Sequence, residues 1–305
     1  MSIQIPWSSH RVLLRETVLE GFLVNDSPIR VGSGREPPLG SIVDLAVIRI
    51  SIGGKTIPYI PGSSLKGVFR STSELIARAK GMRVCSGLSR NTCMDREYSK
   101  ELPGERLHDA IQRLLRERKM EEAIDKFHKY ACLLCKIYGA PSFTGHVKFS
   151  DAYPISDDGK ILEVPLGIRT GIAIDRRTGA VWKGSLYQVE FIEPNTRFRF
   201  QIRASNLPNY AIGLLARVMR MIQEGEVKVG GFKTRGFGRV RFEDLVLKHR
   251  DFPKQTDKVL RALDDYDSVV NMDIAEIKEG WLFAKEKVWD ALRKLEEAWD
   301  HANLR

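Results

Sequence analysis

The chain has 305 residues, of which 43% are hydrophobic and 29% are charged, and its formal net charge is +10. No apolar run reaches the ~18 residues of a membrane span, and no basic segment followed by an apolar one opens the sequence as a signal peptide would. We therefore expect a cytoplasmic protein with no membrane partner. The positive charge favours a polyanionic partner, most simply nucleic acid, over an acidic small molecule.

The first sixty residues predict extended chain. Apolar residues at even spacing predict a strand within residues 10–24, and a loop rich in glycine and polar residues follows over 25–35. Residues 42–60 predict two extended segments joined by a turn at Gly53-Gly54. Asp44 is the single acid in the apolar run 42–48. It is either a solvent-side strand residue or a placed functional carboxylate.

A helix is expected over residues 64–80, and Gly81 would end it. Its predicted apolar stripe consists of Leu65, Val68, Phe69, Leu75, Ile76 and Ala79. Pro61-Gly62 signals a turn before it, and Ser63 or Ser64 can cap the helix start. Lys66 and Arg70 lie four residues apart and share a face, so this start suits a phosphate group. The alternative is an ordinary capped helix with solvated basic residues.

Residues 83–140 read as a helical insertion, with two amphipathic helices expected between 105 and 137. The four cysteines of the chain lie in this insertion. Cys132 and Cys135 are three residues apart, and Cys85 and Cys93 lie in a loop that can fold back onto them. Four thiolates predict a closed, structural Zn²⁺ site, with His128 as a substitute ligand. Buried free cysteines and disulfides remain as alternatives.

The second half returns to strands. We expect strands at 146–152, 198–202 and 240–247, a long hairpin over 168–193, a helix at 209–224, and a charged helical region after about residue 254. This order suits an α+β fold with a β-α-β-β-α-β, ferredoxin-like core. Folds of this kind often present their sheet to RNA.

Two further stretches combine cations with turn residues. The loop 230–239 interleaves glycines with Phe232, Phe237 and three cations, Lys233, Arg235 and Arg239. Glycines allow close approach to a phosphodiester, cations pair with phosphate, and aromatic rings stack on bases. The alternative is a tight turn with both phenylalanines in the core. The hairpin tip carries Arg176 and Arg177, which suit either a solvated turn or a contact with nucleic acid.

Three stretches together resemble the RAMP superfamily of CRISPR-associated proteins, and more narrowly the backbone subunits of type III interference complexes. They are residues 60–67 (IPGSSLKG), residues 169–190 and residues 230–239 (GGFKTRGFGR). The resemblance covers roughly residues 10–250. It implies a modified RRM-like palm over 1–250, with the insertion at 83–140 and a β-hairpin thumb at 168–193. Residues 251–305 would form a C-terminal helical extension.

The resemblance also implies a function. Copies of such a subunit stack along a guide RNA together with other effector subunits, and the thumb displaces a nucleotide where it crosses the guide–target duplex. Asp44 matches the family's catalytic acid, and Arg30 stands where family members often have a histidine. Cleavage would proceed by attack of a ribose 2′-hydroxyl on the adjacent phosphate, with Asp44 orienting the nucleophile or holding Mg²⁺ or Mn²⁺. The expected RNA contacts are Arg30, Ser63, Ser64, Lys66, Arg70, Arg176, Arg177, Lys233, Arg235 and Arg239.

Two other functions fit the same residues. The chain could be a guide-RNA scaffold without cleavage, in which Asp44 is only structural. It could also be a nuclease that processes precursor guide RNA with a histidine as general acid–base. The six histidines form no cluster in the sequence.

Overall fold

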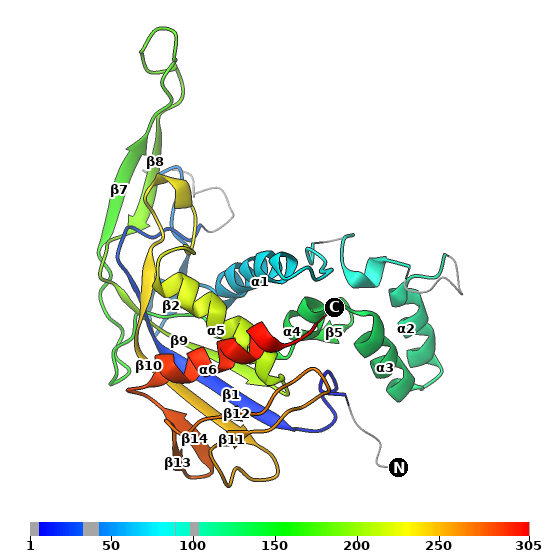
Figure 1. Ribbon diagram of the computed structural model, residues 1–305. Coiled ribbons are helices and arrows are strands. Elements are labelled where there is room, and N and C mark those ends of the chain that lie inside the picture. The colour runs from blue at the N-terminus through cyan, green and yellow to red at the C-terminus, as the bar shows by residue number, and fades with distance from the viewer. Residues whose placement is uncertain (1–5, 33–42, 89, 98–103, 305) are drawn as a thin grey trace.

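The computed structural model describes residues 6–32, 43–88, 90–97 and 104–304. Residues 1–5, 33–42, 89, 98–103 and 305, which belong to predicted segments, therefore lie outside the described residues. The fold is α+β, as predicted. Its main sheet has six strands in the order β13-β14-β10-β1-β9-β6 (Figure 1). No helix in the described ranges combines the length and apolar character needed to cross a bilayer.

The four central strands form the part of the sheet on which the rest is built. β1 (Arg15–Asn25) lies between β10 (Val240–Asp251) and β9 (Arg197–Ser205), and β6 (Val147–Phe149) pairs with the far side of β9. Every one of these pairings is antiparallel. In β9 the buried residues alternate with more exposed ones, because one face of the sheet is covered and the other is open.

Three helices cover the buried face: α1 (Gly62–Ala79), α5 (Asn209–Gln223) and α6 (Val288–His301) (Figure 1). Helices α5 and α6 pack closely, since a Cβ on Gly213 would lie 2.0 Å from the Leu295 carbonyl oxygen. The predicted stripe of α1 is wrong at Leu75, which is 68% exposed, and at Ala79, which is also exposed. Ala77 is buried instead, so the inward face of the helix is rotated from the predicted one near its end.

The insertion contains three helices, not two: α2 (Leu107–Arg116), α3 (Met120–Tyr130) and α4 (Leu133–Tyr138). The break falls at Ala131 and Cys132, whose extended backbone separates α3 from α4. A 3₁₀ turn, η1 (Cys93–Asp95), precedes these helices, and the short strands β4 (Gly139–Ala140) and β5 (Phe143–Thr144) follow them. The insertion has its own apolar core, which includes three of the four cysteines.

Two hairpins were predicted at their observed positions. β2 (Arg49–Ile52) pairs with β3 (Lys55–Pro58) across Gly53 and Gly54, both of which have positive φ. The second hairpin pairs β7 (Leu166–Gly171) with β8 (Tyr187–Ile192) and projects from the body of the molecule (Figure 1). We call residues 166–192 the thumb hairpin. Its outer part exposes several large apolar side chains: Ile172, Ile174, Val181, Trp182 and Leu186.

The expectation of an entirely helical C-terminal region is wrong. Four short strands precede α6: β11 (Val259–Leu260), β12 (Val270–Asn271), β13 (Glu276–Lys278) and β14 (Trp281–Ala284). β14 pairs with β10 and so extends the main sheet. These strands have two to four residues each, which is too short for a period-2 pattern to show in the sequence.

A buried guanidinium joins the two ends of the chain. Arg15, at the start of β1, is completely buried, and all of its N–H groups have acceptors. Nε and Nη2 donate to the two carboxylate oxygens of Asp251 at 2.6 and 3.0 Å. Nη1 donates to Leu207 O and Asn209 Oδ1, and Nη2 also donates to Arg261 O. One side chain thereby holds β1, the end of β10, the start of α5 and the C-terminal region together.

His249, beside this network, makes the fold sensitive to acid. Burial lowers the pKa of His249 to about 4. Between pH 4 and the ordinary pKa of about 6.5, His249 is protonated in the unfolded chain and neutral in the folded chain. The free energy of unfolding therefore falls as the pH falls. Thermal unfolding from pH 6.5 to about 5 should show this loss, at up to about 1.4 kcal/mol per pH unit for this histidine.

The His249→Gln variant should show a shallower dependence of its melting temperature on pH over that window. His301 is exposed, so His301→Gln serves as the control and should keep the wild-type slope. Equal slopes for the wild type and His249→Gln would contradict the assignment.

Candidate nucleic-acid interface

A groove of about 390 Å³ runs between α1 and two loops. Ser64, Gly67 and Ser71 line it from one face of α1, at spacings of three and four residues. Val31 and Gly32 line it from the chain that follows β1, and Gly230, Gly231 and Lys233 from the glycine-rich loop. Two segments that the sequence singled out separately, the helix start and the loop 230–239, therefore meet at one groove.

The glycine-rich loop is fixed to the chain after β1 by backbone hydrogen bonds. The N–H of Gly231 donates to Arg30 O at 2.8 Å, and that of Gly238 donates to Pro28 O at 2.9 Å. Gly230 has φ of +91°, and a Cβ there would lie 2.4 Å from Arg30 O. A side chain at position 230 is therefore excluded both by conformation and by contact.

The cations and aromatic rings of this loop have different surroundings. Phe237 is buried against Phe191, so of the two interpretations of this ring the core position is confirmed and base stacking is wrong. Phe232 is half-buried, with the guanidinium groups of Arg30 and Arg235 5.7 and 5.4 Å from its ring centre. Among the three predicted cations, Lys233 lines the groove, Arg235 donates to the Tyr187 hydroxyl at the thumb base, and Arg239 pairs with Asp26.

Asp44 lies at the base of the thumb hairpin. It is exposed, and its Oδ2 accepts the backbone N–H of Gln188 in β8 at 2.6 Å. The next residue, Leu45, pairs in parallel with β8 through its N–H to Gln188 O at 3.0 Å. Among the described residues Gln188 is the donor to this carboxylate, and no donor is found at its Oδ1.

Arg30 lies beside the chain that carries Asp44. Its Nε and Nη2 donate to the carbonyls of Leu45 and Ala46 at 3.2 and 3.4 Å. Burial lowers the pKa of Arg30, and the nearby charge of Glu190 opposes that shift. Arg30 therefore joins the groove to the Asp44 segment, with its guanidinium bonded to backbone carbonyls of that segment.

The start of α1 differs from the predicted phosphate site. Pro61 is the N-cap residue, and neither Ser63 nor Ser64 caps the helix. The Gly62 N–H donates to Asp151 Oδ1 at 2.7 Å. A carboxylate already occupies the positive end of the helix and would repel a phosphate there. Ser64 lines the groove from the side of the first turn, and Ser63 is exposed next to it.

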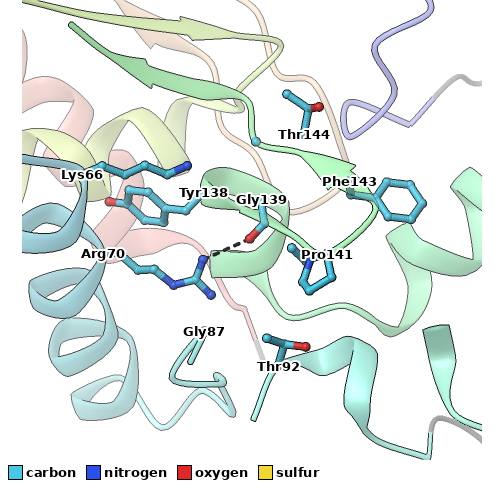
Figure 2. Close-up of a pocket in the computed structure, with 11 residues that line it drawn as sticks. Lys66, Arg70, Gly87, Thr92, Tyr138, Gly139, Pro141, Phe143 and Thr144 are labelled. Atoms are coloured by element: carbon cyan, nitrogen blue, oxygen red, sulfur yellow. Dashed lines mark hydrogen bonds between the residues drawn. The ribbon is translucent and has the colours of Figure 1, made fainter. Parts of the chain in front are cut away.

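Lys66 and Arg70 face a second cavity, of about 400 Å³, between α1 and the insertion (Figure 2). Burial, and the adjacent Arg70, lower the pKa of Lys66. Arg70 Nη1 donates to Gly139 O at 3.0 Å, and Nη2 lies 3.8 Å from the sulfurs of Cys85 and Cys135. The two cations thus lie on a different face of α1 from the groove, and Arg70 is bonded to the insertion.

The four cysteines converge. Their Sγ atoms all lie within 4.8 Å of one another, and Cys85 Sγ is 3.1 Å from Cys135 Sγ. None of the four forms a disulfide. His128, the predicted substitute ligand, lies outside this group and its Nδ1 bonds to the Ser8 hydroxyl at 2.8 Å. Tetrahedral zinc–thiolate bonds of ~2.3 Å place sulfurs about 3.8 Å apart, so the cluster has the size of a closed zinc site.

Arg176 and Arg177 are exposed in the turn at the outer end of the thumb hairpin, apart from the residues that line the groove. Four residues of the site were missed from the sequence. Ser71 follows Ser64 by seven residues, and this helical spacing could have revealed it. Asp151, Arg49 and Glu190 carry no local signal, because their partners lie 89, 141 and 143 residues away.

Substitution of Gly230 should perturb the groove in a measurable way. Gly230→Ala forces a Cβ onto Arg30 O and should lower the melting temperature. Gly236→Ala is the matched control, because Gly236 also has a positive φ, +87°, but has open space around its Cβ position. Both variants carry backbone strain, so an excess loss in Gly230→Ala measures the contact with Arg30. Equal losses would contradict the close approach.

Comparison with known proteins agrees with this architecture. A sequence model of the RAMP superfamily matches residues 23–241, which begin within β1 and end within β10. The chain is also similar to the CRISPR system Cms endoribonuclease Csm3 of Methanocaldococcus jannaschii, with 23% identity over 278 residues, 87% of this chain and 94% of the relative. Because the family match spans the central strands, the insertion, the thumb hairpin and the glycine-rich loop, the chain belongs to the RAMP superfamily.

Proposed function

We propose that this protein is a backbone subunit of a type III CRISPR effector complex that binds guide RNA and cleaves complementary target RNA at regular intervals. Membership of the RAMP superfamily and the similarity to an endoribonuclease of a CRISPR system support the assignment. The observation that carries it is the position of Asp44. Its exposed carboxylate is bonded to β8 of the thumb hairpin, and the segment that follows it pairs at Val47 with Gly32, a residue of the groove.

We infer a ferredoxin-like palm of the RRM type for the body of the protein. In such a fold the four strands of a β-α-β-β-α-β unit have the spatial order 4-1-3-2. The strands β1, β6, β9 and β10 follow one another in the chain and lie in the order β10-β1-β9-β6. Helices α1 and α5 connect them at the two expected places. This order supports the inference.

The groove beside α1 is the proposed path of the guide RNA backbone. Its glycines leave room for a phosphodiester, and the hydroxyls of Ser64 and Ser71 can donate to phosphate oxygens. Lys233 adds a positive charge on the opposite wall. Ser63 and Arg235 lie beside this path. Arg30 supports one wall of it, because its carbonyl accepts the Gly231 N–H. Lys66 and Arg70 would act only where RNA passes over the other face of α1.

The thumb hairpin is proposed to cross the guide–target duplex. Its outer part combines exposed apolar side chains, Trp182 among them, with the cations Arg176 and Arg177. An exposed apolar surface of this kind indicates a partner outside the chain. Bases can stack on the indole ring, and phosphates can pair with the arginines. Further copies of this chain and other effector subunits are the proposed protein partners.

The proposed reaction is attack of a ribose 2′-hydroxyl on the adjacent phosphorus. The hydroxyl gives its proton to water, its oxygen bonds to phosphorus, and the bond to the 5′-oxygen of the next nucleotide breaks as that oxygen takes a proton from water. The products are a 2′,3′-cyclic phosphate and a 5′-hydroxyl. A regular helix holds the 2′-hydroxyl away from the line of attack, so a displaced nucleotide is needed at the site. Asp44 would orient the attacking hydroxyl.

A divalent ion, Mg²⁺ or Mn²⁺, fits this site only if RNA supplies part of its coordination shell. Within the described residues the sole group of three or more potential metal ligands is the cysteine cluster, so Asp44 offers one carboxylate. Mg²⁺ commonly binds to one or two carboxylates together with substrate phosphates and water. Such an ion would stabilise the negative charge that develops on the phosphate.

A histidine-dependent processing nuclease is less well supported. None of the six histidines lines the groove or the second cavity. Burial lowers the pKa values of His128, His146 and His249 to about 4, so these imidazoles are neutral near pH 7. The scaffold alternative is separated from cleavage by the experiment that follows.

Asp44→Asn should abolish cleavage in an assembled complex with guide RNA while leaving target binding intact. The amide keeps the shape and the bond from Gln188, but it removes the negative charge that orients the hydroxyl or holds a metal ion. We expect the cleavage rate to fall by at least about 100-fold. Asp158→Asn, in an exposed turn, controls for the loss of one charge. Unchanged cleavage in Asp44→Asn would identify the chain as a scaffold.

We propose that the four cysteines hold a structural Zn²⁺. Four thiolates around Zn²⁺ carry a net charge of −2, and two cations are placed to balance it. Arg70 approaches two of the sulfurs, and the charges of Cys132 and Cys93 act on Lys136, whose pKa burial lowers. A closed set of four thiolates leaves no open position for a substrate, so this zinc would stabilise the insertion and take no part in cleavage.

Elemental analysis of the purified protein should find about one zinc per chain, as expected for a single four-thiolate site. Cys135→Ser should lower the zinc content and the melting temperature, and a chelator should lower the melting temperature of the wild type. His128→Gln is the control, because His128 lies outside the cluster, and it should retain zinc. A metal-free wild type with full thermal stability would contradict the zinc site.

A further inference from the structure

Glu190 is a buried carboxylate that neither the groove nor the proposed cleavage chemistry uses. It lies in β8, two residues after Gln188, and only 8% of its surface is exposed. Its Oε2 accepts the backbone N–H of Val47 at 2.9 Å, and its Oε1 pairs with Arg49. Its own N–H donates to Leu45 O at 3.0 Å. Main chain and side chain of one residue thus bind three residues of the segment that follows Asp44.

The segment 44–47 depends on such external contacts for its position. It pairs with β8 only through Leu45, at an isolated bridge and not in a regular strand. Arg30 holds the carbonyls of Leu45 and Ala46 from the other side. Glu190 and Arg30 therefore hold the segment from two sides. The bond from the Gln188 N–H to Asp44 Oδ2 and the bridge between Val47 and Gly32 complete its attachment.

Glu190 cannot itself act on RNA. Both of its oxygens are engaged, and its side chain is enclosed at the root of the thumb hairpin. Its effect must therefore pass through the chain that it holds. A misplacement of a catalytic group by about 1 Å can cost about 100-fold in rate, so a residue that fixes Asp44 matters as much as the residues around it.

We propose that Glu190 is the positioning residue for Asp44, and that Asp44 is carried by the thumb hairpin as one unit with β8. The inference rests on the proposed cleavage of target RNA. It adds that the carboxylate keeps its distance from the nucleotide that the thumb displaces, because Glu190 fixes segment 44–47 to the root of the same hairpin.

The test uses the assembled complex with guide RNA and measures target affinity and the single-turnover cleavage rate separately. Glu190→Gln retains an oxygen for the Val47 N–H but loses the pair with Arg49, and Glu190→Ala loses both contacts. We expect the rate at saturating target to fall about 10- to 100-fold, more for alanine, with affinity changed less than about twofold. Glu193→Gln is the matched control on the same chain segment, since the Glu193 side chain bonds to none of residues 43–49 in the described structure.

Variants of Arg49 test the same contact independently, because they remove the partner of Glu190 without changing a residue of β8. Arg49→Lys keeps a cation for Glu190 and should retain more of the cleavage rate than Arg49→Gln, a rescue that a general loss of stability would not give. Melting temperature and complex assembly are measured for every variant. If Glu190→Ala fails to assemble, Glu190→Gln and the Arg49 pair carry the test.

The outcomes separate this inference from the proposed function. Wild-type cleavage by Glu190→Gln and Arg49→Gln, while Asp44→Asn is inactive, would overturn the positioning role and leave the cleavage function in place. Equal loss of binding and cleavage would also overturn it, since it would assign Glu190 a structural role alone. Cleavage that survives Asp44→Asn would remove the function on which the inference rests.

Discussion

The fold depends on one buried guanidinium. Burying an unpaired charge costs several kcal/mol, and partners at every N–H of Arg15 are what make its complete burial tolerable. These partners come from the end of β10, the start of α5 and the C-terminal region. The most distant of them in the sequence, Arg261, lies 246 residues after Arg15. Arg15 fixes the first residues of β1. The chain that follows β1 and the glycine-rich loop lie at the other end of the same strand, where Asn25 pairs with Val240.

At the other end of β1 the site is assembled from main-chain contacts. The chain after β1 pairs with the end of β8 at Ile29 and with the Asp44 segment at Gly32, and the glycine-rich loop bonds to Pro28 and Arg30. Few side chains decide this arrangement. Glycines permit the close approach, Arg30 bridges two of the segments, and Glu190 closes the third side. The groove and the Asp44 carboxylate are therefore positioned by the same set of main-chain hydrogen bonds.

The sequence predicted those features that neighbouring residues determine. Gly53-Gly54 specified a tight hairpin, the apolar spacing specified α1 and α5, and the spacing of Cys132 and Cys135 indicated their convergence with Cys85 and Cys93. Features that depend on distant partners were not predictable. Asp151, just after β6, accepts the first N–H of α1, and Arg70 turns to the cysteines. β14 adds a strand to the sheet beside β10, although its own sequence pattern is too short to predict it. The core position of Phe237 could not be distinguished from a stacking role in the sequence, because the ring that covers it, Phe191, lies in β8 of the distant thumb hairpin.

The bonds that hold Asp44 and its segment to the thumb hairpin all reach residues 188–190, and most of them use the main chain. The described residues 172–186, which form the outer hairpin, make none of these contacts. The root of the hairpin and its projecting part are consequently separable: the outer segment could change in length or sequence while the carboxylate keeps its place. Natural variation, or deliberate exchange of that segment between related subunits, would then alter the proposed contact with the duplex and leave the Asp44 carboxylate in place.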